Sequence, residues 1–236
     1  MNSGLSRTTI HGYLRCLRQI LRWLKDAYDA PRLAHLVPRT PRPRPRNVTV
    51  SQAERAQLLA AAPEDMRLWL LFCADLAIRS GTAARLAPHQ YNPEQRTLSF
   101  VTKWGEHLTL PTTAEIDALI ARCDLTDPRP FCIQLRAVRY GPTPTDVDRY
   151  SERFRIRFNR LKLAVGIRRR IVAHDLRRTA AVRLYQTTRD VRAVQALLGH
   201  QALTSTLWYL DHETTPVSRA LLEEIKRADW SQEHTA

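Results

Sequence analysis

The segment HDLRRTAAVRLYQTTRDVRAVQALLGHQALTSTLWYL, residues 174–210, gathers basic, imidazole and phenol side chains within three short helical patterns. The predicted helices cover residues 174–185, 190–198 and 204–209, and Gly199 ends the second one. His174 and Arg177 are three residues apart, so they project from the same face of the first helix. His200 follows the glycine, and Tyr209 lies in the third helix.

These four side chains suit chemistry on a phosphate. An arginine guanidinium donates two parallel hydrogen bonds to phosphate oxygens, and a histidine donates to such an oxygen or accepts a proton. A tyrosine hydroxyl can attack phosphorus when a neighbour takes its proton and positive groups stabilise the pentavalent phosphate. Taken singly, a tyrosine after an apolar helix is usually a core residue, and a pair such as Arg177-Arg178 usually lies at the surface. The order and spacing of the set favour a phosphate-transfer site.

The composition indicates a polyanionic partner. The chain has 236 residues, of which 44% are hydrophobic, so it can bury a core as one large domain or two small ones. It carries 37 Lys and Arg against 23 Asp and Glu, a net charge of +14. Nucleic acid is the commonest partner of such a chain, although a basic protein of ribosomal type has a similar composition.

Cysteine usage and hydropathy indicate the compartment. None of the four cysteines (Cys16, Cys73, Cys123, Cys132) forms a CxxC pair, which argues against a zinc ribbon. Cys16 and Cys73 fall in apolar helical runs and are predicted to be small core residues in a reducing environment. We see neither an apolar signal core nor a run long enough to cross a membrane, so we expect a cytoplasmic protein without a membrane partner.

The pattern along the chain predicts a mainly α fold of the α+β type, a helical domain with a small antiparallel sheet. Residues 8–29 form an amphipathic helix whose apolar stripe needs the main domain, missing sequence or a partner to cover it. Ser51-Gln52-Ala53-Glu54 is a capping box that starts another helix. Alternation from Arg96 to Leu110 predicts a hairpin. Further helices are predicted at about 65–79, 82–86, 113–123, 148–165 and from Pro216, with mostly loop over 124–146.

Two stretches contain many cations and no acid. Residues 37–47, VPRTPRPRPRN, are predicted to form a stiff linker that also touches DNA, and residues 153–170 are predicted to form a DNA-facing surface. The candidate DNA-binding residues are Arg42, Arg44, Arg46, Arg153, Arg155, Arg157, Arg160, Lys162, Arg168, Arg169 and Arg170.

The motifs HDLRRT and LLGH, followed by a tyrosine nine residues after that histidine, resemble the tyrosine recombinase (phage-type integrase) family. That family has a further arginine in a G-L-R-x-x-E-x-x-x-L segment, which Arg79 matches, and a hairpin lysine in T-K-x-G, which Lys103 matches. The six matched catalytic positions are Arg79, Lys103, His174, Arg177, His200 and Tyr209. The chain departs from the pattern at Ala77, where the family has glycine, and at Thr82, where it has an acid.

The resemblance implies a domain plan and a mechanism. Residues 1–36 would be the remnant of an N-terminal helical core-binding region, 37–50 a Pro/Arg-rich linker and 51–236 the catalytic domain. Tyr209 would attack a DNA phosphate to give a 3′-phosphotyrosyl link, without a metal or another cofactor. Arginines and His200 would stabilise the charge, Lys103 would protonate the leaving 5′-oxygen, and His174 would act as base or positioning group.

The partners that follow are double-stranded DNA and, on DNA, further copies of the chain in a synaptic tetramer. The helix expected at 216–229 either closes its own domain or docks on a neighbouring protomer. Two other functions share these features: a topoisomerase that forms the same 3′ link, and a DNA-binding protein with weak or lost catalysis.

Overall fold

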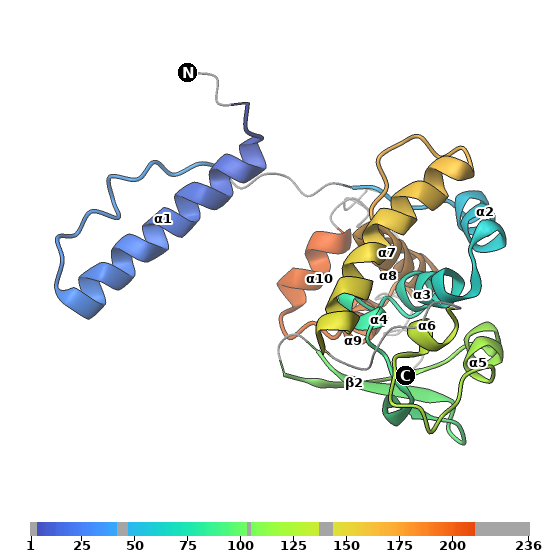
Figure 1. Ribbon diagram of the computed structural model, residues 1–236. Helices are drawn as coiled ribbons and strands as arrows, with labels where there is room; N and C mark the ends of the chain where they lie inside the picture. Colours follow the sequence, from blue (N-terminus) through green and yellow to red (C-terminus); the bar gives the residue numbers. More distant parts are fainter. Residues whose placement is uncertain (1–3, 42–46, 103–104, 137–143, 211–236) are drawn as a thin grey trace, which may run out of the picture. The chain divides into compact units, whose positions relative to one another are not determined.

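The computed structural model describes residues 4–41, 47–102, 105–136 and 144–210. It divides into two compact units, Met1–Arg46 and Asn47–Ala236, which are treated separately below (Figure 1). Within the described residues, no helix is both long and apolar enough to cross a membrane. The helix expected from Pro216 lies outside the described part of the chain.

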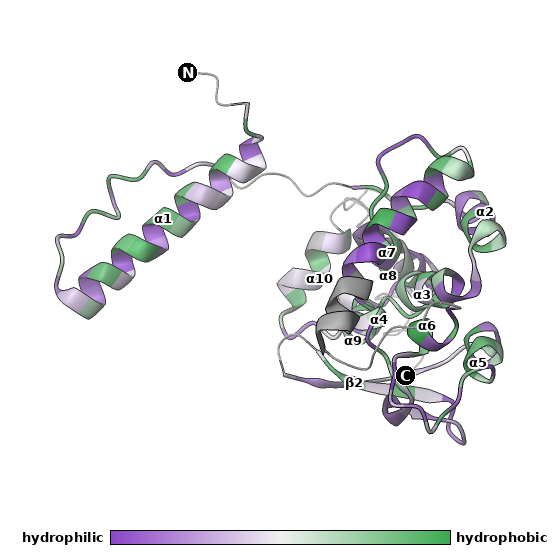
Figure 2. Cartoon of the chain, viewed as in Figure 1, coloured by the Kyte–Doolittle hydropathy of each residue, from purple (hydrophilic) through white to green (hydrophobic). Residues whose placement is uncertain are grey.

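The first unit is built on α1 (Arg7–Tyr28), which confirms the predicted amphipathic helix. The Ser6 hydroxyl caps its start, and Asp29 ends it in a left-handed conformation. Figure 2 shows apolar and polar residues in alternating bands along α1, none of which is buried. The chain after α1 returns along it, and the ring Nδ1 of His11 lies 2.8 Å from the Thr40 hydroxyl. Cys16 is exposed, so its prediction as a core residue was wrong, because α1 buries no residue within its own unit.

The second unit holds the remaining helices. They are α2 (Gln52–Ala61), α3 (Glu64–Ala74), α4 (Ser80–Ala83), α5 (Ala114–Ile120), α6 (Phe131–Gln134), α7 (Pro144–Ala164), α8 (Ala173–Thr188), α9 (Val191–Leu198) and α10 (Leu203–Leu210), with a 3-10 turn at Pro88–Gln90. The capping box is present at the start of α2, where Ser51 and Glu54 satisfy each other's backbone N–H groups. The segment 124–146, predicted to be mostly loop, contains α6 and the start of α7.

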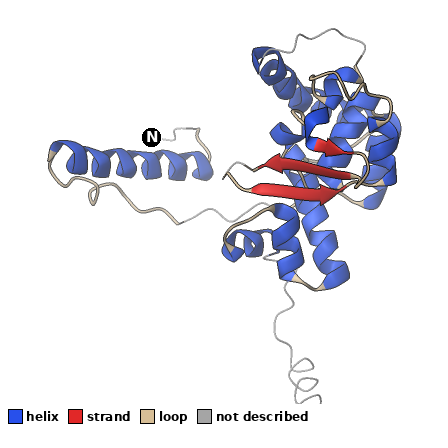
Figure 3. Ribbon diagram, turned by 90° about the horizontal axis from the view of Figure 1, so that it is seen from below, coloured by secondary structure: helices blue, strands red, loops and turns tan. Residues whose placement is uncertain are grey.

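A three-stranded antiparallel sheet covers one side of these helices (Figure 3). Its strands are β1 (Tyr91–Asn92), β2 (Thr97–Val101) and β3 (His107–Pro111). In the β2–β3 hairpin Phe100 pairs with Leu108, which confirms the predicted hairpin. Leu98, Phe100 and Leu110 are buried, whereas Ser99 and Thr109 on the other face are exposed and hydrogen-bonded at 2.8 Å.

The core is centred on α3, which packs on α5, α6 and α8. Trp69 stacks on Phe154 of α7 with 5.2 Å between ring centroids, and its indole N–H donates to the Ser80 carbonyl at 3.0 Å. The buried carboxylate of Asp65 pairs with Arg157 of α7. These contacts fix α7 and the start of α4 against α3. A second apolar cluster joins α8, α9 and α10 and includes Ala181, Val194, Leu198 and Leu210.

Candidate active site

Tyr209 of α10 and His174 of α8 meet although 35 residues separate them in the sequence. The Tyr209 hydroxyl lies 2.9 Å from Nε2 of His174, and the ring centroids are 5.4 Å apart. His174 occupies the first turn of α8, whose start is fixed because the buried Asp175 carboxylate accepts from the Val172 N–H at 2.8 Å. A neutral imidazole offers a lone pair on one ring nitrogen, so Nε2 can accept the phenol proton.

Arg177 lies beneath this pair with only 3% of its surface exposed. Its Nη1 donates to the Ala77 carbonyl, and its Nη2 donates to the Leu198 carbonyl at 2.7 Å. The guanidinium therefore joins the chain before Arg79 to the end of α9. Its Nε is buried and has no acceptor among the described residues. Burial lowers the pKa of Arg177, and the nearby Tyr209 opposes part of this shift.

His200 is aimed into the same site by the end of α9. Gly199 has φ +56°, the left-handed conformation that glycine adopts without a steric cost, and it turns the chain after Leu198. Gln195 Nε2 then donates to the His200 carbonyl at 2.8 Å. The ring Nε2 lies 3.4 Å from Arg177 Nη2, and the ring centroid lies 5.4 Å from that of Tyr209.

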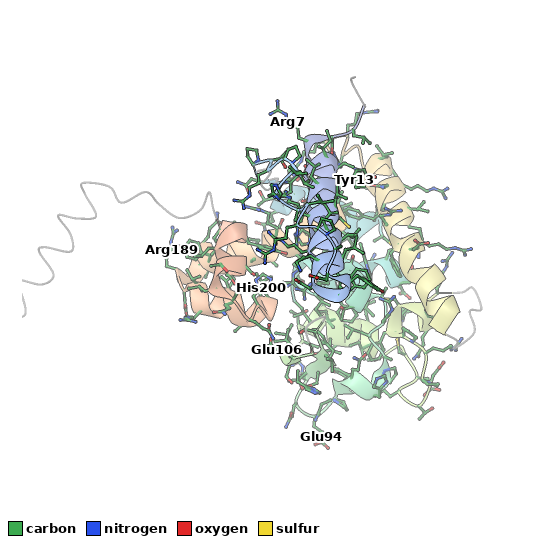
Figure 4. The ribbon with its side chains drawn as sticks, turned by 90° about the vertical axis from the view of Figure 1, so that its left-hand side faces the viewer. Arg7, Tyr13, Glu94, Glu106, Arg189 and His200 are labelled. Carbon is green, nitrogen blue, oxygen red and sulfur yellow. The ribbon has the colours of Figure 1, made fainter. Side chains whose placement is uncertain are left out.

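The β2–β3 hairpin reaches this turn through Gly199. A Cβ placed on Gly199 would lie 3.2 Å from side-chain carbons of both Thr102 and Leu108. Within the hairpin turn, the Thr102 N–H donates to the Glu106 carbonyl at 2.7 Å. Glu106 and His200 line a pocket of about 330 Å³ between the hairpin and α9 (Figure 4). Lys103 belongs to this turn in the sequence but lies outside the described residues.

Arg79 approaches the site from the start of α4. It is the N-terminal flanking residue of that helix, its carbonyl accepts from the Ala83 N–H at 2.8 Å, and its side chain is half-buried. Its positive charge contributes to lowering the pKa of both His174 and His200. Thr82 of the same helix is half-buried. Of the six predicted positions, the structure thus brings five together.

The two histidines are held in the neutral form. Burial, followed by the charges of Arg177 and Arg79, lowers the pKa of His200 to about 4. Desolvation and the same arginines lower the pKa of His174 below its usual value of 6.5. Both rings are therefore neutral at pH 7, and each can accept a proton at one nitrogen while donating from the other. Within the described part of the chain, no group of three or more His, Cys, Asp or Glu residues is arranged to hold a metal ion.

The predicted DNA-binding cations differ in their surroundings. Three of them bond within the protein: Arg157 to Asp65, Lys162 to the Ile171 carbonyl, and Arg169 to Glu54 and the Thr49 carbonyl. The exposed side chains are those of Arg153, Arg155, Arg160, Arg168, Arg169 and Arg170, of which Arg153 and Arg170 also interact within the protein. Arg42, Arg44 and Arg46 lie outside the described residues.

Three features of the site were not recognised from the sequence. The Thr206 side chain is fully buried, and its hydroxyl lies 3.1 Å from Nδ1 of His200. Ala77 adopts φ +51° and presents its carbonyl to Arg177. Arg178, which follows Arg177 in the sequence, is buried as well. Only the Thr206 position carried a signal, since it lies one helical turn before Tyr209.

Comparison with known proteins gives a consistent result. The family model described as "Phage integrase family" matches residues 49–215 of the chain. No curated protein sequence matches this chain.

Solved structures share the fold at low identity. The integrase from mycobacterium phage Brujita is 22% identical with a TM-score of 0.55, over 94% of this chain and 78% of that one. The XerH site-specific recombinase bound to difH substrate is 18% identical with a TM-score of 0.65, over 95% and 66%. A lambda integrase(75-356) dimer bound to a COC' core site is 16% identical with a TM-score of 0.65, over 89% and 75%.

Proposed function

Since the chain belongs to the phage integrase family, the tyrosine recombinases, we propose that it cuts and rejoins double-stranded DNA at specific sites through a 3′-phosphotyrosyl intermediate. The contact of 2.9 Å between the Tyr209 hydroxyl and His174 Nε2 carries this proposal. A phenol beside a neutral imidazole, with a buried guanidinium behind it, is the arrangement that attack on a phosphate diester requires.

Each side chain has a role in the proposed step. The Tyr209 oxygen bonds to phosphorus while His174 Nε2 takes the phenol proton. The bond from phosphorus to the 5′-oxygen breaks, and Lys103 supplies the proton that this oxygen needs. Arg79, Arg177 and His200 donate to the non-bridging oxygens, whose negative charge grows in the transition state. The reverse attack by another 5′-hydroxyl releases Tyr209 and exchanges the strands.

The exposed arginines of α7 and the following turn supply the proposed grip on the DNA backbone. Arg153, Arg155, Arg160, Arg168 and Arg170 lie at the surface, where their guanidinium groups can reach phosphates. Arg157, Lys162 and Arg169 bond within the protein and stabilise the fold in this proposal. The proposal that Arg42, Arg44 and Arg46 contact DNA rests on the sequence alone. We also propose that copies assemble on DNA as a synaptic tetramer, with the segment 216–229 docking in trans.

A nicked duplex cut from the DNA that flanks the gene tests the proposal. A nick just beyond the cleavage site lets the short 5′-hydroxyl fragment diffuse away, so the covalent protein–DNA product accumulates and is counted on a denaturing gel. Wild type is expected to form it, Tyr209→Phe is expected not to, and Tyr185→Phe on α8 is the matched control that keeps activity. Wild type without an adduct, although it binds the duplex, would leave only a DNA-binding protein.

A plasmid lacking the flanking DNA distinguishes the topoisomerase. A site-specific recombinase leaves such a supercoiled plasmid unchanged under conditions where it cleaves the flanking duplex. Relaxation of the plasmid that depends on Tyr209 would contradict the site-specific proposal while leaving the tyrosine chemistry in place.

A further inference from the structure

Thr206 is the buried partner of His200 and comes from the helix that carries Tyr209. We propose that Thr206 is a positioning residue whose hydroxyl pairs with Nδ1 of His200 in either tautomer, so that a neutral His200 can donate to the DNA phosphate. The inference deepens the proposed function and rests on it.

The geometry leaves the His200 ring with two polar neighbours, one at each nitrogen. Nδ1 faces the Thr206 hydroxyl at 3.1 Å, and Nε2 faces Arg177 Nη2 at 3.4 Å. The Thr206 side chain is fully buried, so water does not replace its hydroxyl at Nδ1. The ring orientation is therefore set from both sides.

In the DNA-free protein these neighbours favour one tautomer. Arg177 has only N–H donors, so its contact with Nε2 is favourable when Nε2 presents a lone pair. A neutral ring then carries its proton on Nδ1 and donates it to the Thr206 oxygen. The alternative, a proton on both nitrogens, places a third positive charge beside Arg177 and Arg79.

Binding of a phosphate reverses the requirement. A phosphate oxygen accepts hydrogen bonds, so His200 contributes only if Nε2 carries a proton. The half-buried ring exchanges protons with solvent when it turns outward, losing one from Nδ1 and gaining one at Nε2, so it stays neutral. Nδ1 then has a lone pair, and the Thr206 hydroxyl turns to donate to it. A hydroxyl can accept in one state and donate in the other, which an apolar side chain of the same shape cannot do.

The position of Thr206 also links two parts of the site. It lies three residues before Tyr209 on α10, so the same helix holds the phenol against His174 and the hydroxyl against His200. A shift of α10 would change both contacts together.

The first test compares Thr206→Val, Thr206→Ser and Thr204→Val with wild type in single-turnover cleavage of the nicked flanking duplex. We expect Thr206→Val to slow cleavage by about tenfold or more, because a buried ring nitrogen loses its partner. Binding of the duplex should change by less than about threefold by the same reasoning. Thr206→Ser should restore the rate, since it keeps the hydroxyl, and Thr204→Val should match wild type, since Thr204 is exposed on the same helix.

A second test reads the tautomer without DNA and without activity. In protein labelled with ¹⁵N-histidine, two-bond ¹H–¹⁵N correlation spectra distinguish a protonated ring nitrogen from an unprotonated one, and His200→Ala assigns the signal. Wild type and Thr206→Ser should carry the proton on Nδ1 at pH 7.5 as a hydrogen-bonded N–H, and in Thr206→Val this proton should lose the downfield ¹H shift that the hydrogen bond to the hydroxyl gives.

The outcomes separate this inference from the proposed function. If wild type forms no covalent adduct, the proposed DNA cleavage is contradicted, whatever the NMR spectra of His200 show. Wild type that cleaves, with Thr206→Val cleaving equally fast or Thr206→Ser as slow as Thr206→Val, would overturn the role of Thr206 alone. An unchanged His200 Nδ1–H shift in Thr206→Val would overturn it as well. If the valine variant does not fold, Thr206→Ala serves in its place, and cleavage by Thr206→Ala as fast as by Thr206→Ser would overturn the role.

Discussion

At the scale of single residues, the lowered pKa of His174 predicts the pH range of the proposed cleavage. If His174 takes the phenol proton, the reaction needs its neutral form, which persists below pH 6.5 because desolvation and Arg177 disfavour the cation. Single-turnover cleavage should therefore be constant from about pH 7 to 8 and fall only below about pH 6.5. Duplex binding measured over the same range is the control. A rate that is already halved above pH 7 would exclude His174 as the base.

The depressed pKa of His200 also affects stability. Its folded value is about 4 and its reference value is 6.5, so the unfolded chain takes up a proton first as the pH falls. The contribution of His200 to the free energy of unfolding is thus fully present above pH 6.5 and is lost as the pH falls towards 4. Loss of cleavage in that range must be compared with unfolding measured by circular dichroism.

Substitutions of Ala77 test whether its backbone carbonyl positions Arg177 for cleavage. Its φ of +51° costs an alanine about 1 kcal/mol, and its fully buried methyl group returns a similar amount. Ala77→Gly should therefore unfold in urea within about 1 kcal/mol of wild type and cleave within about threefold of it. Ala77→Val should be less stable by about 2 kcal/mol or more and should slow cleavage, because a β-branched residue resists this conformation and turns the carbonyl from Arg177. Equal cleavage by both variants would show that this carbonyl does not position Arg177.

At the scale of elements, Gly199 holds the α9 turn against the β2–β3 hairpin. Gly199→Ala adds a methyl group 3.2 Å from both Thr102 and Leu108 at a residue with φ +56°. The expected cost is about 1 to 3 kcal/mol in the free energy of unfolding, together with slower cleavage because His200 moves. Gly166→Ala, which has φ +81° but open space around its Cβ, is the matched control for conformation alone. If both variants cleave at the same rate, the hairpin contact has no role in placing His200.

Local sequence patterns predicted most elements but not their partners. The capping box at Ser51 and the alternation from Arg96 to Leu110 are short-range signals, and the structure follows both. The run 153–170 contains cations and no acid. Arg157 pairs with Asp65 and Arg169 pairs with Glu54, which lie 92 and 115 residues away in the sequence, so the run itself did not reveal these partners. The spacing of Thr206 from Tyr209 did not reveal its role, because that role depends on burial. Motif spacing singled out His174, Arg177, His200 and Tyr209, and the resemblance to the family added Arg79. The fold brings these five together.

At the scale of the whole molecule, a net charge of +14 makes DNA affinity depend on salt. Replacing Arg155, Arg160 and Arg168 together by alanine should reduce the slope of log affinity against log salt concentration by about one for each phosphate that is no longer neutralised. Arg169→Ala removes one positive charge, from a side chain that pairs with Glu54, so the slope should stay unchanged. Fluorescence anisotropy on a labelled duplex between low and physiological salt measures both. Equal slopes for the triple variant and wild type would contradict the assignment of these arginines to the DNA backbone.

The identity of the covalent bond tests the central claim most directly. After cleavage of the nicked flanking duplex, nuclease and protease digestion leaves a nucleotide-bearing peptide whose modified residue is located by mass spectrometry. We predict one modified residue, Tyr209, joined to the 3′-phosphate of the cut strand, with a free 5′-hydroxyl on the released fragment. A bond to any other residue, or to a 5′-phosphate, would contradict the account.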